Sequence, residues 1–398
     1  MRFDEMFEAV AHKRLALVDL PDRGSHQHEL NGSAALRSFF GDSEQTNGHL
    51  TWIRFSDDSE PVAETGQFTF YDARAKSAAR TGRSEWRLYY SGEPLADSSP
   101  SDLLVFAQST SGDVSALVFA KDSGWERAAL ALFPIDGDSE QLSFVSPEAL
   151  SKTELDIVRR TIMEQLGLDY AMPEVPSLTD IVVGKFGLAF PTTAEMGILA
   201  REMTDSDLSD PDALLLGWID MEEQLFRALE RVIVGEQIER GFESVDEFLS
   251  VSLSVQNRRK SRMGHALEHH LAALFDAKGL NYSRQVRTEG NRTADFVFPG
   301  ASEYHDASFP TERLTILAAK STCKDRWPQV LADADRIPIK HLGTLDTALS
   351  TSQLSDMASK QITPVMPRRI REGYVGWDNH ESILAVDAFL SVIAGREA

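Results

Sequence analysis

Two apolar stretches decide the fold of the C-terminal half, TADFVFPG at residues 293–300 and LTILAAKSTCKDRW at residues 314–327. Each is typical of a buried strand, and each contains one charged residue that the apolar run would hold rigidly, Asp295 and Lys320. We expect the two runs to be neighbouring strands of one hairpin. Phosphodiester hydrolysis needs a carboxylate that holds Mg²⁺ and a cation near the attacking water. Asp295 and Lys320 are therefore candidate catalytic residues, although an acid and a Lys at this separation also occur by chance.

Further charged residues surround this pair. Lys324, Asp325 and Arg326 follow Lys320, and an Arg can donate two hydrogen bonds to guanine while an Asp accepts from cytosine. These three residues are candidates for DNA recognition, and a solvated charged turn is the equally frequent alternative. Asp333, on a helix expected over 326–336, is a candidate second metal carboxylate. Three cations of the stretch NRRKSR could hold phosphates, or simply form a solvated helix end; they are Arg258, Arg259 and Arg262.

Composition restricts the class of protein. The 398 residues carry 40 Lys and Arg against 62 Asp and Glu, a net charge of −22 that argues against a nucleic-acid partner. Residues 251–340, however, hold 14 basic and 10 acidic residues, so this region can attract phosphate. The single Cys323 excludes a disulfide framework and a Cys-built zinc site. No apolar run reaches membrane length and the N-terminus does not read as a signal peptide, so we expect a cytoplasmic protein without a membrane partner.

The N-terminal part reads as a β-rich barrel or sandwich. Apolar and aromatic runs are separated by Gly, Ser, Asp and Pro clusters, and we expect strands at 49–55, 67–71, 85–90, 103–108, 114–120 and 128–133. A basic connection over 72–83 and the strand after it could follow a DNA backbone. The candidate residues there are Lys76, Arg80, Arg83 and Arg87, with His26 as a weaker one.

Helical periodicity dominates from residue 146 onward. We expect helices at 146–167, with Ser146 as N-cap and Pro147 at the first helical position, and at 211–242, 245–262, 264–279, 326–336 and 384–395. The prolines of 171–210 indicate a linker. The sequence thus predicts an α+β multidomain protein with an N-terminal domain over 1–170 and a C-terminal domain over 211–398.

One pattern favours different chemistry. His265, Glu268 and His269 form an H-x-x-E-H sequence on an expected helix, which is the spacing of an inverted zinc-peptidase motif. A third ligand would have to come from elsewhere in the chain. The structural alternative is an amphipathic helix whose leucines face the core.

The C-terminal half resembles the EcoRII-like type IIE restriction endonucleases. The resemblance is carried by residues 241–280, 288–310 and 317–337, which include ADFVFP and KSTCKDRW in order and spacing, and it covers roughly 211–345. The N-terminal half resembles that family only through KRL, SHQHEL and the basic connection before Glu85.

The resemblance implies an α/β nuclease core of the PD-(D/E)XK type. It places Asp295 and Asp333 at the metal-binding carboxylates, Lys320 at the catalytic lysine and Glu268 at an upstream helix acid. Ala294 replaces the Pro of the motif, and Asp333 replaces a family Glu. The resemblance also implies roles in the site for Tyr304, and in reading the CC/GG part of the DNA for Lys324, Asp325 and Arg326.

At the level of the whole protein, the resemblance implies a homodimer that uses Mg²⁺ to cut double-stranded DNA at a CCWGG-type site. A B3-like pseudobarrel at the N-terminus would bind a second, effector copy of the site in the region of His26, Lys76, Arg80, Arg83 and Arg87. A cognate methyltransferase would be a functional partner. The alternative is a DNA-binding regulator that has lost cleavage, against which the intact Asp295 and Lys320 argue.

Overall fold

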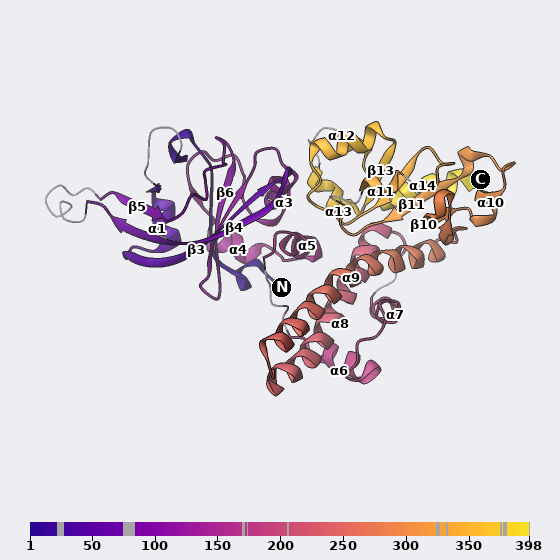
Figure 1. The fold of residues 1–398 in the computed structure, drawn as a ribbon, viewed down its shortest axis with the longest axis horizontal. Helices are drawn as coiled ribbons and strands as arrows, with labels where there is room; N and C mark the ends of the chain where they lie inside the picture. The colour runs from indigo at the N-terminus through magenta and orange to yellow at the C-terminus, as the bar shows by residue number, and fades with distance from the viewer. Residues whose placement is uncertain are drawn as a thin grey trace. The chain divides into compact units, whose positions relative to one another are not determined.

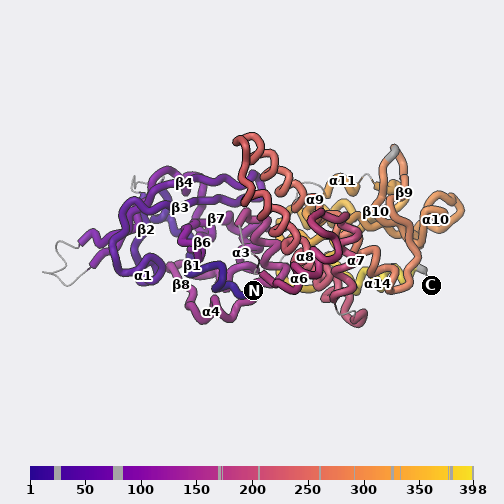
Figure 2. The backbone as a smooth tube through the Cα atoms, turned by 90° about the horizontal axis from the view of Figure 1, so that it is seen from below, coloured from indigo at the N-terminus to yellow at the C-terminus, as the bar shows by residue number. Residues whose placement is uncertain are grey.

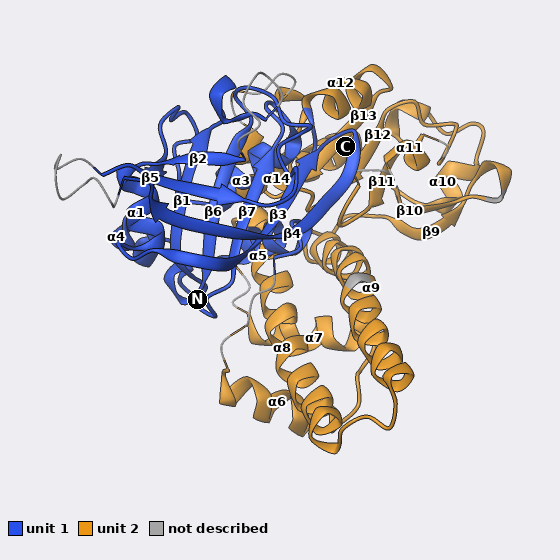
Figure 3. Ribbon diagram, turned by 60° about the vertical axis from the view of Figure 1, so that its left-hand side comes forward, with its two compact units in different colours: residues 1–171, 347–350 blue, residues 172–346, 351–398 orange. Residues whose placement is uncertain are grey.

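The computed structural model describes residues 1–21, 28–74, 84–168, 172, 174–204, 207–323, 327–331, 333–374, 376 and 380–397. The chain divides into two compact units, residues 1–171 with 347–350 and residues 172–346 with 351–398 (Figure 3). Each unit contains a mixed sheet and several helices, so the α+β class predicted from the sequence is confirmed. Among the described residues, no helix combines the length and the apolar character that crossing a membrane requires.

The sheet of unit 1 contains eight strands among the described residues, in the order β2-β5-β4-β3-β7-β6-β1-β8. All neighbours are antiparallel except β3 and β7. An aromatic core that includes Phe40, Trp52, Phe70 and Phe106 lies against it. The strands are β1 (Phe7–Arg14), β2 (Glu29–Gly32), β3 (Gln45–Ser56), β4 (Ser59–Asp72), β5 (Trp86–Tyr90), β6 (Leu103–Ser109), β7 (Val114–Phe119) and β8 (Ser143–Phe144).

One strand expected in this unit is a helix instead. Residues 128–132 belong to α3 (Gly124–Leu132), not to a strand. The hydroxyl of Ser123 caps this helix by accepting from the backbone N–H of Glu126 at 3.0 Å. A short, fully apolar run has no periodicity that separates a buried strand from a buried helix, so the N-cap upstream was the informative signal.

The helices of unit 1 depend on side-chain caps. Ser146 caps α4 (Pro147–Lys152) at the expected position, with its hydroxyl 3.2 Å from the N–H of Ala149. The helix expected to continue to 167 is interrupted after Lys152, and α5 (Ile157–Gln165) begins at a second cap, Asp156. The remaining described α-helix of this unit is α1 (Ala34–Phe40).

Unit 2 begins with helices where the sequence suggested a linker. The segment expected to be a linker folds into α6 (Pro176–Phe186) and α7 (Thr193–Met203), and both pack against α8 (Pro211–Arg240) (Figure 1). Leu178, Val182 and Leu199 are buried in that contact. The prolines start helices here rather than breaking them, because Pro176 and Pro211 occupy first-turn positions.

The two helices expected over 245–262 and 264–279 are one helix, α9 (Val245–Ala277), with Gly264 in its interior. A Gly in a helix costs about 1 kcal/mol relative to Ala, which strong helix formers on both sides can offset. The helix ends as predicted, because Gly279 adopts a φ of +68° and the N–H of Leu280 donates to the carbonyl of Phe275 at 3.1 Å.

The second sheet has the order β14-β13-β12-β11-β10-β9 among the described residues. Its β9, β10 and β11 are antiparallel, and β11 to β14 are parallel. The strands are β9 (Ser283–Arg287), β10 (Thr293–Phe298), β11 (Thr315–Ala319), β12 (Lys340–Gly343), β13 (Ile362–Met366) and β14 (Leu384–Ala385). The helices that follow α9 are α10 (Ala301–His305), α11 (Trp327–Val330), α12 (Thr351–Ser359), α13 (Arg368–Arg371) and α14 (Val386–Glu397). Figure 2 shows β9, β10 and α10 next to one another.

The helix expected over 326–336 is much shorter in the structure. Helix α11 ends at Val330, so Asp333 lies on the connection to β12 and not on a helical face. Ala334 could not belong to a right-handed helix that continued to residue 336, because its φ is +52°.

A buried histidine should make the stability of unit 2 depend on pH. His341 in β12 is buried, with Nδ1 3.1 Å from the carbonyl oxygen of Ile316. Burial, with the charge of Arg396 adding to it, lowers the pKa of its imidazole from 6.5 to about 4. Below pH 6.5 the unfolded chain therefore binds a proton that the folded unit does not accept until about pH 4. The free energy of unfolding should fall across this window, by at most about 3 kcal/mol.

Urea denaturation of the parent and of His341→Gln, followed between about pH 7 and pH 4.5, measures this effect. We expect a flatter profile for His341→Gln than for the parent. His265→Gln, at an exposed position of the same unit, should keep the parental profile. If the two variants give parallel profiles, another group carries the pH dependence.

Candidate active site

Asp295 lies in β10, between β9 and β11, which both pair with it. Its Oδ2 accepts hydrogen bonds from the backbone N–H of Ala319 and from Nζ of Lys320, both at 2.9 Å. Its Oδ1 lies 3.4 Å from Nε2 of Gln285, which stands opposite it in the β9–β10 register. The predicted hairpin of two strands is confirmed. The two charged residues that the sequence singled out are in direct contact.

Lys320 is the first residue after β11, and the β-sheet still holds its backbone. Its N–H donates to the carbonyl of Gly343 on β12 at 2.9 Å. Its side chain keeps 27% of its surface exposed, so the ammonium can reach a bound molecule. Ala318, two residues earlier, occupies the strand position that shares a face with Lys320, and it has no carboxylate. A second acid near Asp295 must therefore come from another element.

Glu268 comes from α9, which the sheet holds in place. Phe275, two turns further along that helix, packs edge-on against Phe296 and Phe298 with ring centroids 5.2 and 5.1 Å away. The Oε1 of Glu268 accepts hydrogen bonds from Arg284 at 2.8 Å and from Gln285 at 3.0 Å. Burial opposes ionisation of this carboxyl, but these two donors outweigh it and lower its pKa. Glu268 is consequently an anion in the folded protein near neutral pH.

Gln285 joins the two acids. Its amide nitrogen donates to Glu268 and also faces Asp295, so one side chain from β9 links α9 with β10. Its backbone has a φ of +50°, a conformation that is strained for a residue with a side chain. Such strain persists only where the surroundings hold it, and it is frequent at functional sites.

Asp333 provides the second acid near Asp295. Burial and the negative charge of Asp295 both raise the pKa of its carboxyl, against the attraction of Lys320 and Arg292. The charge of Asp295 thus acts on the Asp333 carboxyl. A divalent cation would remove this repulsion, and Mg²⁺ commonly uses only one or two protein carboxylates, with water and phosphate as its other ligands. Asp295 and Asp333 therefore fit the ion that the sequence predicts.

The zinc alternative gains no support. Among the described residues, no group of three or more His, Cys, Asp or Glu side chains is arranged to hold a metal ion. Nδ1 of His265 faces the carbonyl oxygen of Ser261 at 2.9 Å, within its own helix. Arg284 places a cation between Glu268 and His269, 3.4 Å from Nδ1 of the latter, and burial together with this charge lowers the pKa of His269. A zinc ion bound by Glu268 and His269 would be repelled by the positive charge of Arg284.

Tyr304 makes its contacts elsewhere. It is buried in α10, and its hydroxyl donates to Oε2 of Glu289 at 2.6 Å. Burial and this carboxylate raise the pKa of the Tyr304 hydroxyl. Hydrogen bonds thus connect Asp295 with Lys320 directly and with Glu268 through Gln285, whereas Tyr304 is engaged with Glu289.

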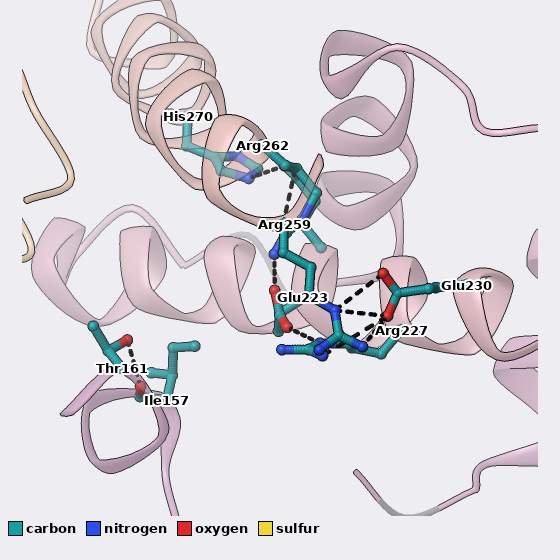
Figure 4. A network of polar contacts seen from close by, with 9 residues as sticks. Ile157, Thr161, Glu223, Arg227, Glu230, Arg259, Arg262 and His270 are labelled. Carbon is teal, nitrogen blue, oxygen red and sulfur yellow. Dashed lines mark hydrogen bonds and ion pairs between the residues drawn. The ribbon is translucent and has the colours of Figure 1, made fainter. Parts of the chain in front are cut away.

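The arginines expected to hold phosphate lie in the helical part of unit 2. Arg262 is buried and pairs with Glu222 and Glu223, whereas Arg258 stacks on the ring of Phe190 at 3.9 Å. These positions differ from the expected solvated helix end, because α8 supplies carboxylates to the face of α9 that carries the arginines. Figure 4 shows the resulting network, which includes Glu223, Arg227, Glu230, Arg259, Arg262 and His270.

Several predicted residues lie outside the described part of the chain. The DNA-recognition candidates Lys324, Asp325 and Arg326 are among them, and so are His26, Lys76, Arg80 and Arg83. Arg87 is described, and its guanidinium pairs with Glu29 and Glu85 on the same sheet region. Its expected role in binding effector DNA stays a prediction.

Sequence reasoning missed two residues of the site, Arg284 and Gln285, and also Glu289, which contacts Tyr304 and the backbone of Asp335. All three lie on or directly after β9, a strand that the sequence analysis did not assign. Their polar character resembles that of an ordinary exposed edge strand. The available signal was their position, immediately before the strand of Asp295 and opposite it in a hairpin.

Parts of this chain are similar in sequence to known restriction enzymes. Residues 226–390 match the family model described as EcoRII C terminal. A curated relative is the type II restriction enzyme EcoRII of Escherichia coli, which is 40% identical over 212 residues, 53% of this chain and 52% of the relative. The predicted resemblance to EcoRII-like enzymes is confirmed. The chain spans about half the length of the relative that it matches.

Two solved structures are also similar to this chain. One is metal-depleted Ecl18kI in complex with uncleaved DNA, with 17% identity, coverage of 55% of this chain and 83% of that chain, and a TM-score of 0.45. The other is the complex of the restriction endonuclease PspGI with substrate DNA, with 12% identity, coverage of 56% and 94%, and a TM-score of 0.41.

Proposed function

We propose that the protein is a type II site-specific deoxyribonuclease that hydrolyses both strands of DNA in a Mg²⁺-dependent reaction. The observation that carries the proposal is the contact of Asp295 with Lys320 and with the N–H of Ala319. It joins a metal-binding acid to a cation on rigid strands, as the hydrolysis requires. The similarity of the surrounding region to EcoRII supports the same reaction.

Each residue of the site has a chemical role in this proposal. Asp295 and Asp333 would hold Mg²⁺, and such an ion supplies positive charge that activates the nucleophile and stabilises the transition state. Lys320 has ammonium N–H groups beyond the one bonded to Asp295, and these can bind the attacking water and a phosphate oxygen. Glu268 and Gln285 keep the Asp295 carboxylate in one orientation.

The finer parts of the proposal follow from the EcoRII-like sequence features. The recognition site is of the CCWGG type, read in part by Lys324, Asp325 and Arg326. The active form is a homodimer, which explains two cuts at one site. The N-terminal unit is a B3-like pseudobarrel that binds effector DNA through the region of His26, Lys76, Arg80, Arg83 and Arg87. A cognate methyltransferase protects the host DNA.

Digestion of a sequenced plasmid with Mg²⁺, followed by mapping of the ends, tests the proposal. We expect ends at one short repeated sequence, no cleavage in EDTA, and faster cleavage when a duplex containing that sequence is added. Asp295→Asn removes the metal-binding charge with little change in shape and should leave the plasmid intact. A protein that retards the cognate duplex in a gel but never cuts it would instead be the non-cleaving DNA-binding regulator.

A further inference from the structure

The segment that carries Asp333 has a strained but well-supported backbone. Residues 333–337 lie between α11 and β12, and Ala334 among them combines a φ of +52° with complete burial of its side chain. Ile337, also buried, closes the turn by donating its N–H to the carbonyl of Ala334 at 2.9 Å. An L-residue in this backbone conformation needs support from its surroundings. Two sets of side chains supply such support, one from each side.

Lys340 supports the segment from the sheet. It is buried in β12, and its Nζ donates to the carbonyl oxygens of Ala334 at 3.1 Å and Ile337 at 2.8 Å. Burial lowers the pKa of this ammonium, which means that the charge is costly where it stands. An apolar side chain would fill the same space at no such cost. Only the lysine can bond to both the Ala334 and the Ile337 carbonyl, which lie on either side of residues 335 and 336.

Glu289 and Tyr304 support the segment from the other side. One oxygen of Glu289, Oε2, accepts from the backbone N–H of Asp335 at 3.1 Å and from the hydroxyl of Tyr304 at 2.6 Å. Arg336 adds to this attachment, because its guanidinium donates to the carbonyl oxygens of Glu303 and Tyr304. Tyr304 belongs to the same buried cluster as Ala334 and Ile337. The Tyr304 hydroxyl is thus linked to the backbone of Asp335 through the carboxylate of Glu289.

The position of this segment determines where the Asp333 carboxylate lies. An Asp side chain has one methylene fewer than Glu and cannot compensate for a displaced backbone by extending. In the proposed function Asp295 and Asp333 hold the same ion, and two carboxylates that share a site repel each other unless a cation lies between them. An unsupported segment could relieve this repulsion by moving away, and it would then lose the ion.

We propose that Tyr304, Glu289 and Lys340 are positioning residues that hold Asp333 beside Asp295 and thereby set the affinity of the site for its divalent cation. The inference rests on the proposed function, because it takes Asp295 and Asp333 as the metal-binding pair. Tyr304 in this arrangement touches neither DNA nor the reacting atoms. It orients Glu289, and Glu289 holds the backbone two residues after Asp333.

Tyr304→Phe tests the proposal, with Tyr282→Phe as a matched control. The hydroxyl of Tyr282 also donates to a carboxylate, Asp276, at 2.7 Å, but away from the Asp333 segment. Two quantities are measured: the Mg²⁺ concentration that gives half the maximal cleavage rate, and the dissociation constant of Mn²⁺ from the protein alone, from the paramagnetic resonance signal of free Mn²⁺. For Tyr304→Phe we expect both to rise about 10- to 100-fold, with cleavage recovering at saturating Mg²⁺. Tyr282→Phe should match the parent.

Two further variants test the route of the effect. Lys340→Met keeps the bulk of the side chain and should weaken Mn²⁺ binding as Tyr304→Phe does. In a Glu289→Ala background, the added Tyr304→Phe change should alter the Mn²⁺ dissociation constant by less than about threefold, because its route is already removed. Circular dichroism establishes that each variant is folded.

Three outcomes would overturn the inference. Unchanged Mn²⁺ binding with cleavage lost at every Mg²⁺ concentration would place Tyr304 at the reacting atoms. Unchanged values in both measurements would show that the support is irrelevant to the metal, and a parent that binds no Mn²⁺ would remove the premise. A parent that binds Mn²⁺ yet cuts no DNA would instead contradict the proposed function, and the comparison of Mn²⁺ affinities would still decide the role of Tyr304.

Discussion

Replacing Lys320 by Ala should abolish DNA cleavage while leaving DNA affinity close to that of the parent. The change removes the only charged donor to the Asp295 carboxylate among the described contacts, together with the N–H groups that would face a DNA phosphate in the proposed function. Loss of one donor that stabilises transition-state charge typically costs about 10²- to 10³-fold in rate, and loss of a full charge costs more. The backbone N–H of Ala319 still holds Asp295, so the local fold should survive.

Single-turnover cleavage in Mg²⁺ and gel retardation in Ca²⁺ separate the two effects of the change. Lys185→Ala is the matched control, because Lys185 forms an ion pair of nearly the same length, 3.0 Å to Glu202, far from the site in sequence. Lys320→Arg should also lose most activity, since a planar guanidinium cannot replace a compact ammonium in a space shaped for it. Cleavage by Lys320→Ala at the parental rate would disprove the assignment.

The centre of the site could be predicted because its strands are apolar. Asp295 and Lys320 are conspicuous in runs of buried residues, and a charge kept in such a run needs a partner. The structure supplies that partner in each case. Neighbouring strands in a hairpin bring such residues together with few alternatives, so spacing along the sequence was enough.

The surroundings of the pair could not be predicted in the same way. Gln285 and Ala334 have left-handed backbone conformations that depend on tertiary contacts. Neither residue is a Gly or Asn, the residue types from which such a conformation can be predicted. Asp333 was expected on a helix because its neighbours are good helix formers. Lys340 is charged and yet buried in β12. At each of these residues, contacts with distant parts of the chain override local propensity. The sequence alone does not show such contacts.

The same limit explains the arginines of α9. The stretch NRRKSR has the composition of a phosphate-binding surface, yet Arg262 is buried and its charge is matched by acids of α8, some 40 residues earlier in the chain. A sequence shows how many cations a helix carries, but it does not show which face meets another helix. The acids Glu222, Glu223 and Glu230 gave the available signal, because α8 also reads as an amphipathic helix.

Arg262→Ala should destabilise unit 2 by about 3–5 kcal/mol, which is the typical cost of breaking a buried ion pair by removing one of its members. The side chain of Arg262 is 5% exposed, and those of Glu222 and Glu223 are 0% and 2% exposed. The guanidinium also stacks on the ring of Phe226 at 4.6 Å, and this contact would be lost as well. Urea denaturation at neutral pH measures the change in the free energy of unfolding.

Arg240→Ala provides the contrast, because Arg240 forms an exposed pair with Glu247 on the same two helices and should cost less than about 1 kcal/mol. DNA binding gives the second readout. If Arg262 contacted a phosphate, its loss would lower the dependence of log affinity on log salt by about one counterion. We expect that slope to be unchanged, because a guanidinium enclosed by two carboxylates and an aromatic ring has no path to DNA. If Arg262→Ala kept the parental free energy of unfolding and lowered the salt dependence of DNA binding, Arg262 would be a DNA-binding residue instead.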